Sequence, residues 1–217
     1  MLHDLINSTR FPRYSYNSLS NTLSIQSVAG SIHEKAVSTV STAFTLACDK
    51  LPIMDQDRIH IVTNQTFTNF QGDYRRSEKI PDAALEVETI EGKIELKFIL
   101  EVGLAETYEM LVKDAKMWLE GTKTVTIVML VKIEEEPAFK CPLRSSSEDG
   151  ICEHEVDVQE EITEEMFSLA GPYGPAVYKG VSWVGTITGF IEIWTRDPDT
   201  HLAIPTKAPQ VSCFLPS

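Results

Sequence analysis

Two strand-like runs separated by one helix-length segment limit how this chain can fold. The first run, residues 93–102, is ended by Gly103, and the second covers residues 124–133. Between them, residues 106–120 repeat apolar side chains at helical spacing. A strand, a helix and a strand in this order predict a parallel pair of strands joined by a right-handed crossover. We therefore expect an α/β fold.

The segments before this unit add a helix and two strands. Ser31 followed by Glu34 resembles a capping box, and the apolar spacing after it predicts a helix that ends before Leu51-Pro52. Residues 58–62 and 83–87 are expected to be strands, and Glu91-Gly92 is typical of a tight turn. The expected order is therefore helix, three strands, helix, strand, and residues 181–194 predict one or two late strands.

Charge is concentrated in one segment. The 217 residues include 19 basic and 32 acidic ones, a net charge of −13. Residues 134–165 hold two basic and twelve acidic residues, a charge of −10, while the rest of the chain carries 17 basic and 20 acidic residues, a charge of −3. We interpret 134–165 as a solvated acidic insertion in a single domain, 31–217, that follows an irregular N-terminal extension, 1–30.

Composition also bears on the compartment and the partners. No apolar run reaches the roughly 20 residues of a membrane span, and residues 1–13 lack a secretory signal pattern. The four cysteines are widely spaced, and Cys141 with Cys152-Glu153-His154 matches no strong zinc pattern. We expect an intracellular protein with free thiols and no membrane partner. The net charge argues against coating nucleic acid by bulk electrostatics.

Two carboxylates are the candidate chemical site. Asp82 follows Pro81 at the start of one expected strand, and Glu101 stands at the end of the next, each about nine residues from the turn. An antiparallel hairpin brings its two outer ends together, so these side chains are expected to converge. Such a pair repels unless a cation lies between, and Mg²⁺ prefers oxygen ligands. Asp82 can equally be a turn residue that binds backbone amides.

The Pro81-Asp82 pair, an 18-residue spacer and Glu101-Val102-Gly103 resemble the PD-(D/E)XK, or restriction-endonuclease-like, nuclease superfamily. The run from Glu101 through Tyr108, Leu111 and Asp114 to Trp118-Leu119 resembles uncharacterised fungal members and, more distantly, Uma2-type proteins. The resemblance covers about residues 31–133, with weaker similarity over 182–214. It implies a core of helix, three-stranded meander, helix and strand. The resemblance to fungal members implies a cytoplasmic or nuclear setting.

The resemblance also implies roles for single residues. Asp82 and Glu101 would be metal ligands for Mg²⁺ or Mn²⁺, with Glu34 of the first helix as a third; Glu34 can also be only a capping residue. The family's lysine two positions after the second acid is absent, because position 103 is glycine. In some members the lysine moves to the next helix, where Lys116 lies at the border of the apolar face. Lys97 is the other candidate, on the strand face of Glu101.

Three functions follow from the resemblance. The first is a metal-dependent nuclease that hydrolyses phosphodiester bonds in nucleic acid, with homodimers expected if both strands are cut. The second is a catalytically inactive nuclease-like scaffold that acts as a protein interaction module, favoured by Gly103 and by the lack of a basic patch. In the third, the acidic insertion covers the cleft and inhibits binding.

Overall fold

The computed structural model describes residues 13–26, 30–137, 163–171, 174–206 and 210–211. The chain divides into two compact units. The first comprises Met1–Lys132 and Ile191–Gln210, and the second comprises Ile133–Phe190 and Val211–Ser217. The fold is mixed α/β, as expected, with few helices and a mixed sheet. The predicted boundaries of the N-terminal extension, the single domain and the insertion stay a prediction.

The first half of the chain contains both strands and helices. They are β1 (Arg13–Asn17), β2 (Thr22–Gln26), α1 (Ser31–Cys48), α2 (Ile53–Gln56), β3 (Ile59–Val62), the short helix η1 (Gly72–Tyr74), β4 (Ala83–Glu88), β5 (Ile94–Gly103) and α3 (Tyr108–Gly121). Later elements are mostly strands. They are β6 (Ile127–Glu136), η2 (Glu164–Met166), β7 (Ser168–Leu169), β8 (Ala176–Tyr178), β9 (Val181–Val184), β10 (Thr186–Arg196), β11 (Ala203–Pro205) and β12 (Gln210–Val211).

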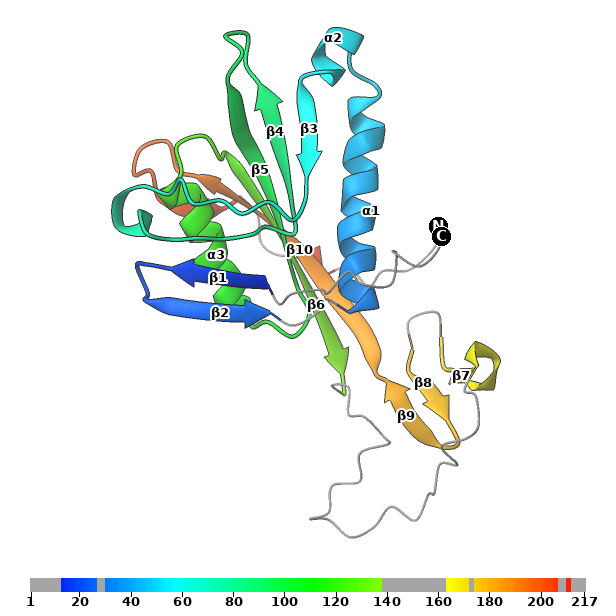
Figure 1. The fold of residues 1–217 in the computed structure, drawn as a ribbon. Coiled ribbons are helices and arrows are strands. Elements are labelled where there is room, and N and C mark those ends of the chain that lie inside the picture. The colour runs from blue at the N-terminus through cyan, green and yellow to red at the C-terminus, as the bar shows by residue number, and fades with distance from the viewer. Residues whose placement is uncertain (1–12, 27–29, 138–162, 172–173, 207–209, 212–217) are drawn as a thin grey trace, which may run out of the picture. The chain divides into compact units, whose positions relative to one another are not determined.

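A seven-stranded sheet runs in the order β11-β10-β6-β5-β4-β3, with β12 paired to β10 (Figure 1). The neighbours β3, β4 and β5 are antiparallel, and β5 and β6 are parallel. The predicted meander and the predicted strand–helix–strand crossover are both confirmed. Gly92 forms the turn between β4 and β5 with a φ of 74°, a left-handed conformation that favours glycine.

The two long helices of the first unit pack on opposite faces of β5, because successive side chains of a strand alternate between faces (Figure 1). Phe98 contacts Phe44 of α1, with ring centroids 4.5 Å apart. The next residue, Ile99, is fully buried in the core that includes Trp118 of α3. The odd-numbered positions of β5, including Glu101 and Gly103, therefore face α3.

The N-terminus of α1 differs from the prediction. Gly30 is the N-cap residue, Ser31 is already helical, and no side-chain hydrogen bond caps this end. The capping-box interpretation of Ser31 and Glu34 is therefore wrong. The helix still ends at Cys48, as the spacing predicted.

Residues 13–26, for which the sequence predicts no regular structure, form the antiparallel hairpin β1–β2. Polar contacts attach it to the segment before β4. Tyr16 and Glu78 exchange two backbone hydrogen bonds of 2.7 and 2.9 Å, and the Ser18 amide donates to Ser77 Oγ at 2.9 Å. Composition gave no sign of this hairpin because its alternating pattern places hydroxyls, not apolar side chains, on one face.

The second unit contains the three-stranded antiparallel sheet β7-β8-β9. Phe167, Tyr178 and Trp183 form an aromatic cluster with ring centroids 5.6 to 6.1 Å apart. The first acidic residues of the predicted insertion, Glu134–Glu136, belong to β6. Residues 138–162 of the insertion, with the Cys141 and Cys152-Glu153-His154 group, lie outside the described residues. No helix in the described ranges is long and apolar enough to cross a membrane.

A single arginine from β10 closes the C-terminal end of α3. The Arg196 guanidinium donates to the carbonyl oxygens of Leu119, Thr122 and Val125. Helices end with unsatisfied carbonyls and a partial negative charge, and α3 has no basic residue in its own last turn. Arg196 supplies both the donors and the positive charge from a distant part of the chain.

We predict that Arg196→Met lowers the free energy of unfolding by about 2–4 kcal/mol, because the carbonyls of Leu119 in α3 and of Thr122 and Val125 after it lose the Arg196 donor. Chemical denaturation measures this loss. Arg75→Met is the matched control, since Arg75 is exposed and its side chain forms no hydrogen bond among the described residues; its effect should stay within about 0.5 kcal/mol. Equal effects of the two substitutions would contradict the capping role.

Candidate functional site

Asp82 is buried at the start of β4, directly before the first residue paired with β5. Its Oδ2 accepts a hydrogen bond from the Val102 amide at 2.7 Å. Its Oδ1 lies 3.2 Å from Nε2 of His33, on the first turn of α1. Asp82 therefore does accept from a backbone amide, as the alternative interpretation expected. Both of its carboxylate oxygens have a contact.

Glu101 is buried on the face of β5 that packs against α3. Trp118 of α3 donates its indole N–H to Glu101 Oε1 at 2.6 Å. The other oxygen, Oε2, lies 3.5 Å from the Nζ of Lys79. The two predicted acids lie at the same end of the sheet: Asp82 accepts from the amide of Val102, the residue after Glu101, and its charge raises the pKa of Glu101.

Lys79 is the residue that the sequence did not single out. Its side chain is 2% exposed, and its Nζ lies 2.5 Å from Oδ2 of Asp114, which is buried on α3. Backbone hydrogen bonds of 2.8 and 3.0 Å to Phe67 fix the chain at this position. The ammonium group therefore joins the segment before β4 to β5 through Glu101 and to α3 through Asp114.

Electrostatics within the cluster explain why this lysine stays charged. Burial alone would lower the pKa of the Lys79 ammonium, but Asp114 and then Glu101 raise it above its ordinary value. Burial raises the pKa of Glu101 well above its ordinary value, although Lys79 opposes that effect. Glu106, at the edge of the cluster, also has a raised pKa, first from burial and then from Asp114. Carboxyl groups thus outnumber the cations around them.

Gly103 occupies the position where the resembling family carries its lysine. A Cβ atom on Gly103 would lie 2.8 Å from Cδ1 and 3.1 Å from Cγ of Leu111. Leu111 is fully buried against β5, so it cannot move aside without opening the core. A lysine therefore does not fit at position 103 while α3 packs this closely, and Lys79 reaches Glu101 on the same α3-facing side of β5, where it also pairs with Asp114.

The remaining predicted site residues lie apart from this cluster. Glu34 is 55% exposed, and its Oε1 is 4.0 Å from His33 Nδ1, so the imidazole separates it from Asp82. Lys97 pairs with Glu95 at 2.6 Å, four residues or about 13 Å along the strand from Glu101. Lys116 is exposed on α3. The structure brings together Asp82 and Glu101 but none of these three.

The arrangement does not fit a divalent cation as it stands. Within the described residues, no three His, Cys, Asp or Glu side chains are placed to hold a metal ion. Asp82 already accepts from an amide and contacts His33, while Glu101 contacts an indole N–H and an ammonium group. Lys79 supplies positive charge to Glu101 and Asp114 from within the chain.

Sequence reasoning missed Lys79, His33 and Glu106. Lys79 stands three residues before Asp82 in a stretch read as a loop, so no periodicity pointed to it. Asp114 belonged to the quoted run from Glu101 to Leu119, but it was not assigned a role. The sequence did contain a signal for Lys79. This residue stands directly before Ile80-Pro81-Asp82, where a strand begins, so its side chain can reach the same end of the sheet as Asp82.

Comparisons with known protein families, curated proteins and solved structures find no match for this chain.

We predict that Lys79→Met lowers the free energy of unfolding by about 3–5 kcal/mol, because it leaves two buried carboxylates without their cation. Lys97→Met is the matched control, since that lysine forms an exposed pair with Glu95, and its effect should stay within about 1 kcal/mol. Thermal and chemical denaturation measure both. Similar small losses in the two variants would mean that the buried ammonium group does not stabilise the fold.

We predict that Glu101→Gln becomes more stable relative to the wild type as pH rises. The pKa of Glu101 is raised on folding, so the folded protein holds this proton more tightly, and the stability it gives is lost as pH rises from 4.5 through the raised pKa. Gln stays neutral and can still accept from Trp118. The stability difference should therefore change by up to about 1.4 kcal/mol per pH unit in that window. A pH-independent difference in urea titrations would contradict this sign.

Proposed function

We propose that the first unit has a restriction-endonuclease-like core in which a buried lysine takes the place of a divalent metal. The order α1, the β3–β4–β5 meander, α3 and β6 supports this core, as does the convergence of Asp82 and Glu101. The observation that carries the proposal is the Lys79 ammonium group between Asp114 and Glu101. The protein then serves as an interaction module for a protein partner rather than as a phosphodiesterase.

The physical argument concerns charge. A pair of buried carboxylates is stable only if a cation compensates it, and in the resembling family that cation is a metal. Here an ammonium group does so from within the chain. An internal cation cannot polarise a phosphodiester oxygen or activate a bound water as Mg²⁺ does, because it offers only N–H donors. The fold is retained, while the chemistry that requires an exchangeable metal is lost.

Three further features agree with this proposal. Leu111 blocks the side-chain space at Gly103, so the lysine that the family uses there cannot be accommodated. Lys116 and Lys97, the alternative lysines, lie away from the acids. The strongly negative charge of the chain also disfavours nucleic acid as its partner. We propose the cytoplasmic or nuclear setting that the resemblance to fungal members implies.

A metal-dependent nuclease is the second candidate, and one observation favours it. Glu106 lies at the edge of the cluster, is close enough to Asp114 and Asp82 for both to raise its pKa, and is more exposed than Glu101. If Lys79 swung away from Glu101, then Asp82, Glu101 and Glu106 would be available to Mg²⁺ or Mn²⁺. Lys79 would then be the lysine that Gly103 cannot supply.

Calorimetric titration with Mn²⁺ and Mg²⁺ separates the two candidates. For the scaffold we expect no saturable heat from wild-type protein, and gained Mn²⁺ binding in Lys79→Ser, which frees the carboxylates. Lys97→Ser should show no gain. Wild-type binding that is lost in both Asp82→Asn and Glu101→Gln, together with cleavage of DNA or RNA, would instead establish the nuclease and overturn the scaffold.

A further inference from the structure

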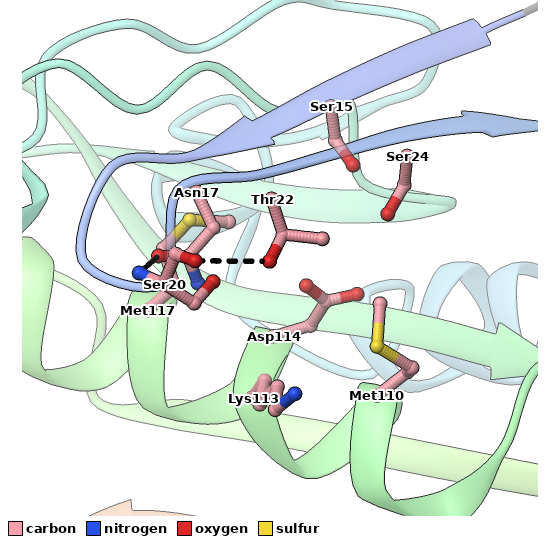
Figure 2. Close-up of a pocket in the computed structure, with 9 residues that line it drawn as sticks. All are labelled: Ser15, Asn17, Ser20, Thr22, Ser24, Met110, Lys113, Asp114 and Met117. Atoms are coloured by element: carbon pink, nitrogen blue, oxygen red, sulfur yellow. Dashed lines mark hydrogen bonds between the residues drawn. The ribbon is translucent and has the colours of Figure 1, made fainter.

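The β1–β2 hairpin places its apolar side chains on the face turned away from the first unit. Figure 2 shows the hydroxyl groups of Ser15 and Ser24 pointing from the two strands toward α3. Side chains alternate along a strand, so Leu23 and Ile25 point to the opposite, outer face. These two residues are 60% and 68% exposed. The outer face of β2 is therefore open to contact from outside the described part of the chain.

One edge of β2 is open as well. The Tyr16 amide and carbonyl bond to the backbone of Glu78, so they point away from β2. Tyr16 stands opposite Leu23, and Tyr14 stands opposite Ile25. Because hydrogen-bonded and non-hydrogen-bonded pairs alternate in an antiparallel ladder, the N–H and C=O groups of Leu23 and Ile25 point away from β1. Among the described residues, nothing hydrogen-bonds to these backbone groups.

This edge lacks the features by which proteins keep exposed strands from pairing. Thr22–Gln26 contains no charged residue and no proline, and it pairs with β1 at all of its positions without a bulge. The end strands of the seven-stranded sheet do carry such features: β11 ends in Pro205, and β3 is short and directly follows Asp57 and Arg58. The free edge of β2 is therefore a template for another strand.

Charge bears on which strand this edge accepts. The whole chain carries a net charge of −13, so two copies repel each other overall. Residues 13–26, in contrast, contain no acidic residue and only one basic one, Arg13. Charges farther apart than about 8–10 Å are largely screened at physiological salt, so two such hairpins can meet without bringing acids together. The neutral edge of β2 thus fits the equally neutral β2 of a second copy.

The register of β2 also makes it complementary to itself. When two copies pair antiparallel about Ser24, Leu23 of each copy lies opposite Ile25 of the other. These are hydrogen-bonded pairs, which exchange both N–H···O bonds, so every free backbone group of the two edges gains a partner. The Leu23 and Ile25 side chains then contact each other on the outer face, and the two Ser24 hydroxyls lie side by side on the inner face.

We propose that a second copy of this chain pairs along the free edge of β2, forming a four-stranded sheet β1-β2-β2-β1 around a two-fold axis at Ser24. Two such short strands bury less than the roughly 800 Å² per partner of a standard interface, so the dimer is weak and depends on concentration. The proposal is independent of the function proposed for the Lys79 cluster, since it needs neither a metal nor catalysis.

Sedimentation equilibrium of the full chain over a range of concentrations tests the proposal. We expect the mass to rise from that of one copy toward that of two, with a Kd on the order of 100 µM. Ile25→Lys places a charge on each paired edge and should weaken dimerisation about tenfold or more. Ile90→Lys is the matched control, because Ile90 is 94% exposed in the turn between β4 and β5, and it should leave the Kd unchanged.

Cross-linking tests the register. The Cα atoms of a non-hydrogen-bonded antiparallel pair lie about 4.5 Å apart, within the range that a disulfide spans. In a chain whose four native cysteines are replaced by serine, we expect Ser24→Cys to form a disulfide-linked dimer in a glutathione redox buffer. Ser15→Cys is the control, since β1 lies one strand farther from the two-fold axis, and it should stay monomeric.

The proposal is overturned if the wild-type chain stays monomeric at every concentration. A dimer that folded Ile25→Lys does not weaken would also overturn it, because the interface would then lie elsewhere. Equal cross-linking of folded Ser15→Cys and Ser24→Cys would mean that the hairpins meet by collision and not in this register.

Discussion

The ion contacts of Lys79 are the interaction on which the first unit depends. The Lys79 ammonium group connects three segments that are distant in sequence: the stretch before β4, strand β5 through Glu101, and helix α3 through Asp114. A buried charge is costly unless it is paired, and here one cation serves two carboxylates. If Lys79 were replaced by a neutral residue, Glu101 and Asp114 would both be left as buried carboxylates without a cation. Both lie at the interface where α3 packs on the sheet.

This contact also explains the neighbouring sequence. Trp118 can be fully buried because its indole N–H reaches Glu101, and Glu101 can be buried because Lys79 compensates its charge. Leu111 then packs directly on Gly103, where a larger side chain would collide. Polar and apolar packing are therefore coupled across α3: the close approach of the helix needs the glycine, and the buried acid needs the lysine.

Much of this framework follows from sequence. The parallel pair β5–β6, the β4–β5 hairpin and the convergence of Asp82 with Glu101 follow from local periodicity and from the geometry of strand ends. The role of Lys79 does not, because its partners are 22 and 35 residues away and no pattern near it repeats. The β1–β2 hairpin is not predicted for a related reason. Its half-buried face carries mainly hydroxyl groups, so its sequence lacks the usual pattern in which apolar side chains face inward. Gly30, rather than Ser31, is the N-cap residue of α1, and no side-chain hydrogen bond caps this end.

A crystal structure grown with Mn²⁺, with anomalous diffraction recorded at the manganese edge, would test the central claim most directly. The account predicts no anomalous peak among Asp82, Glu101 and Asp114, with the Lys79 side chain ordered between Asp114 and Glu101. An anomalous peak about 2.2 Å from oxygens of Asp82 and Glu101, with Lys79 displaced, would contradict it, because such a peak would make the lysine a gate to a metal site rather than its replacement.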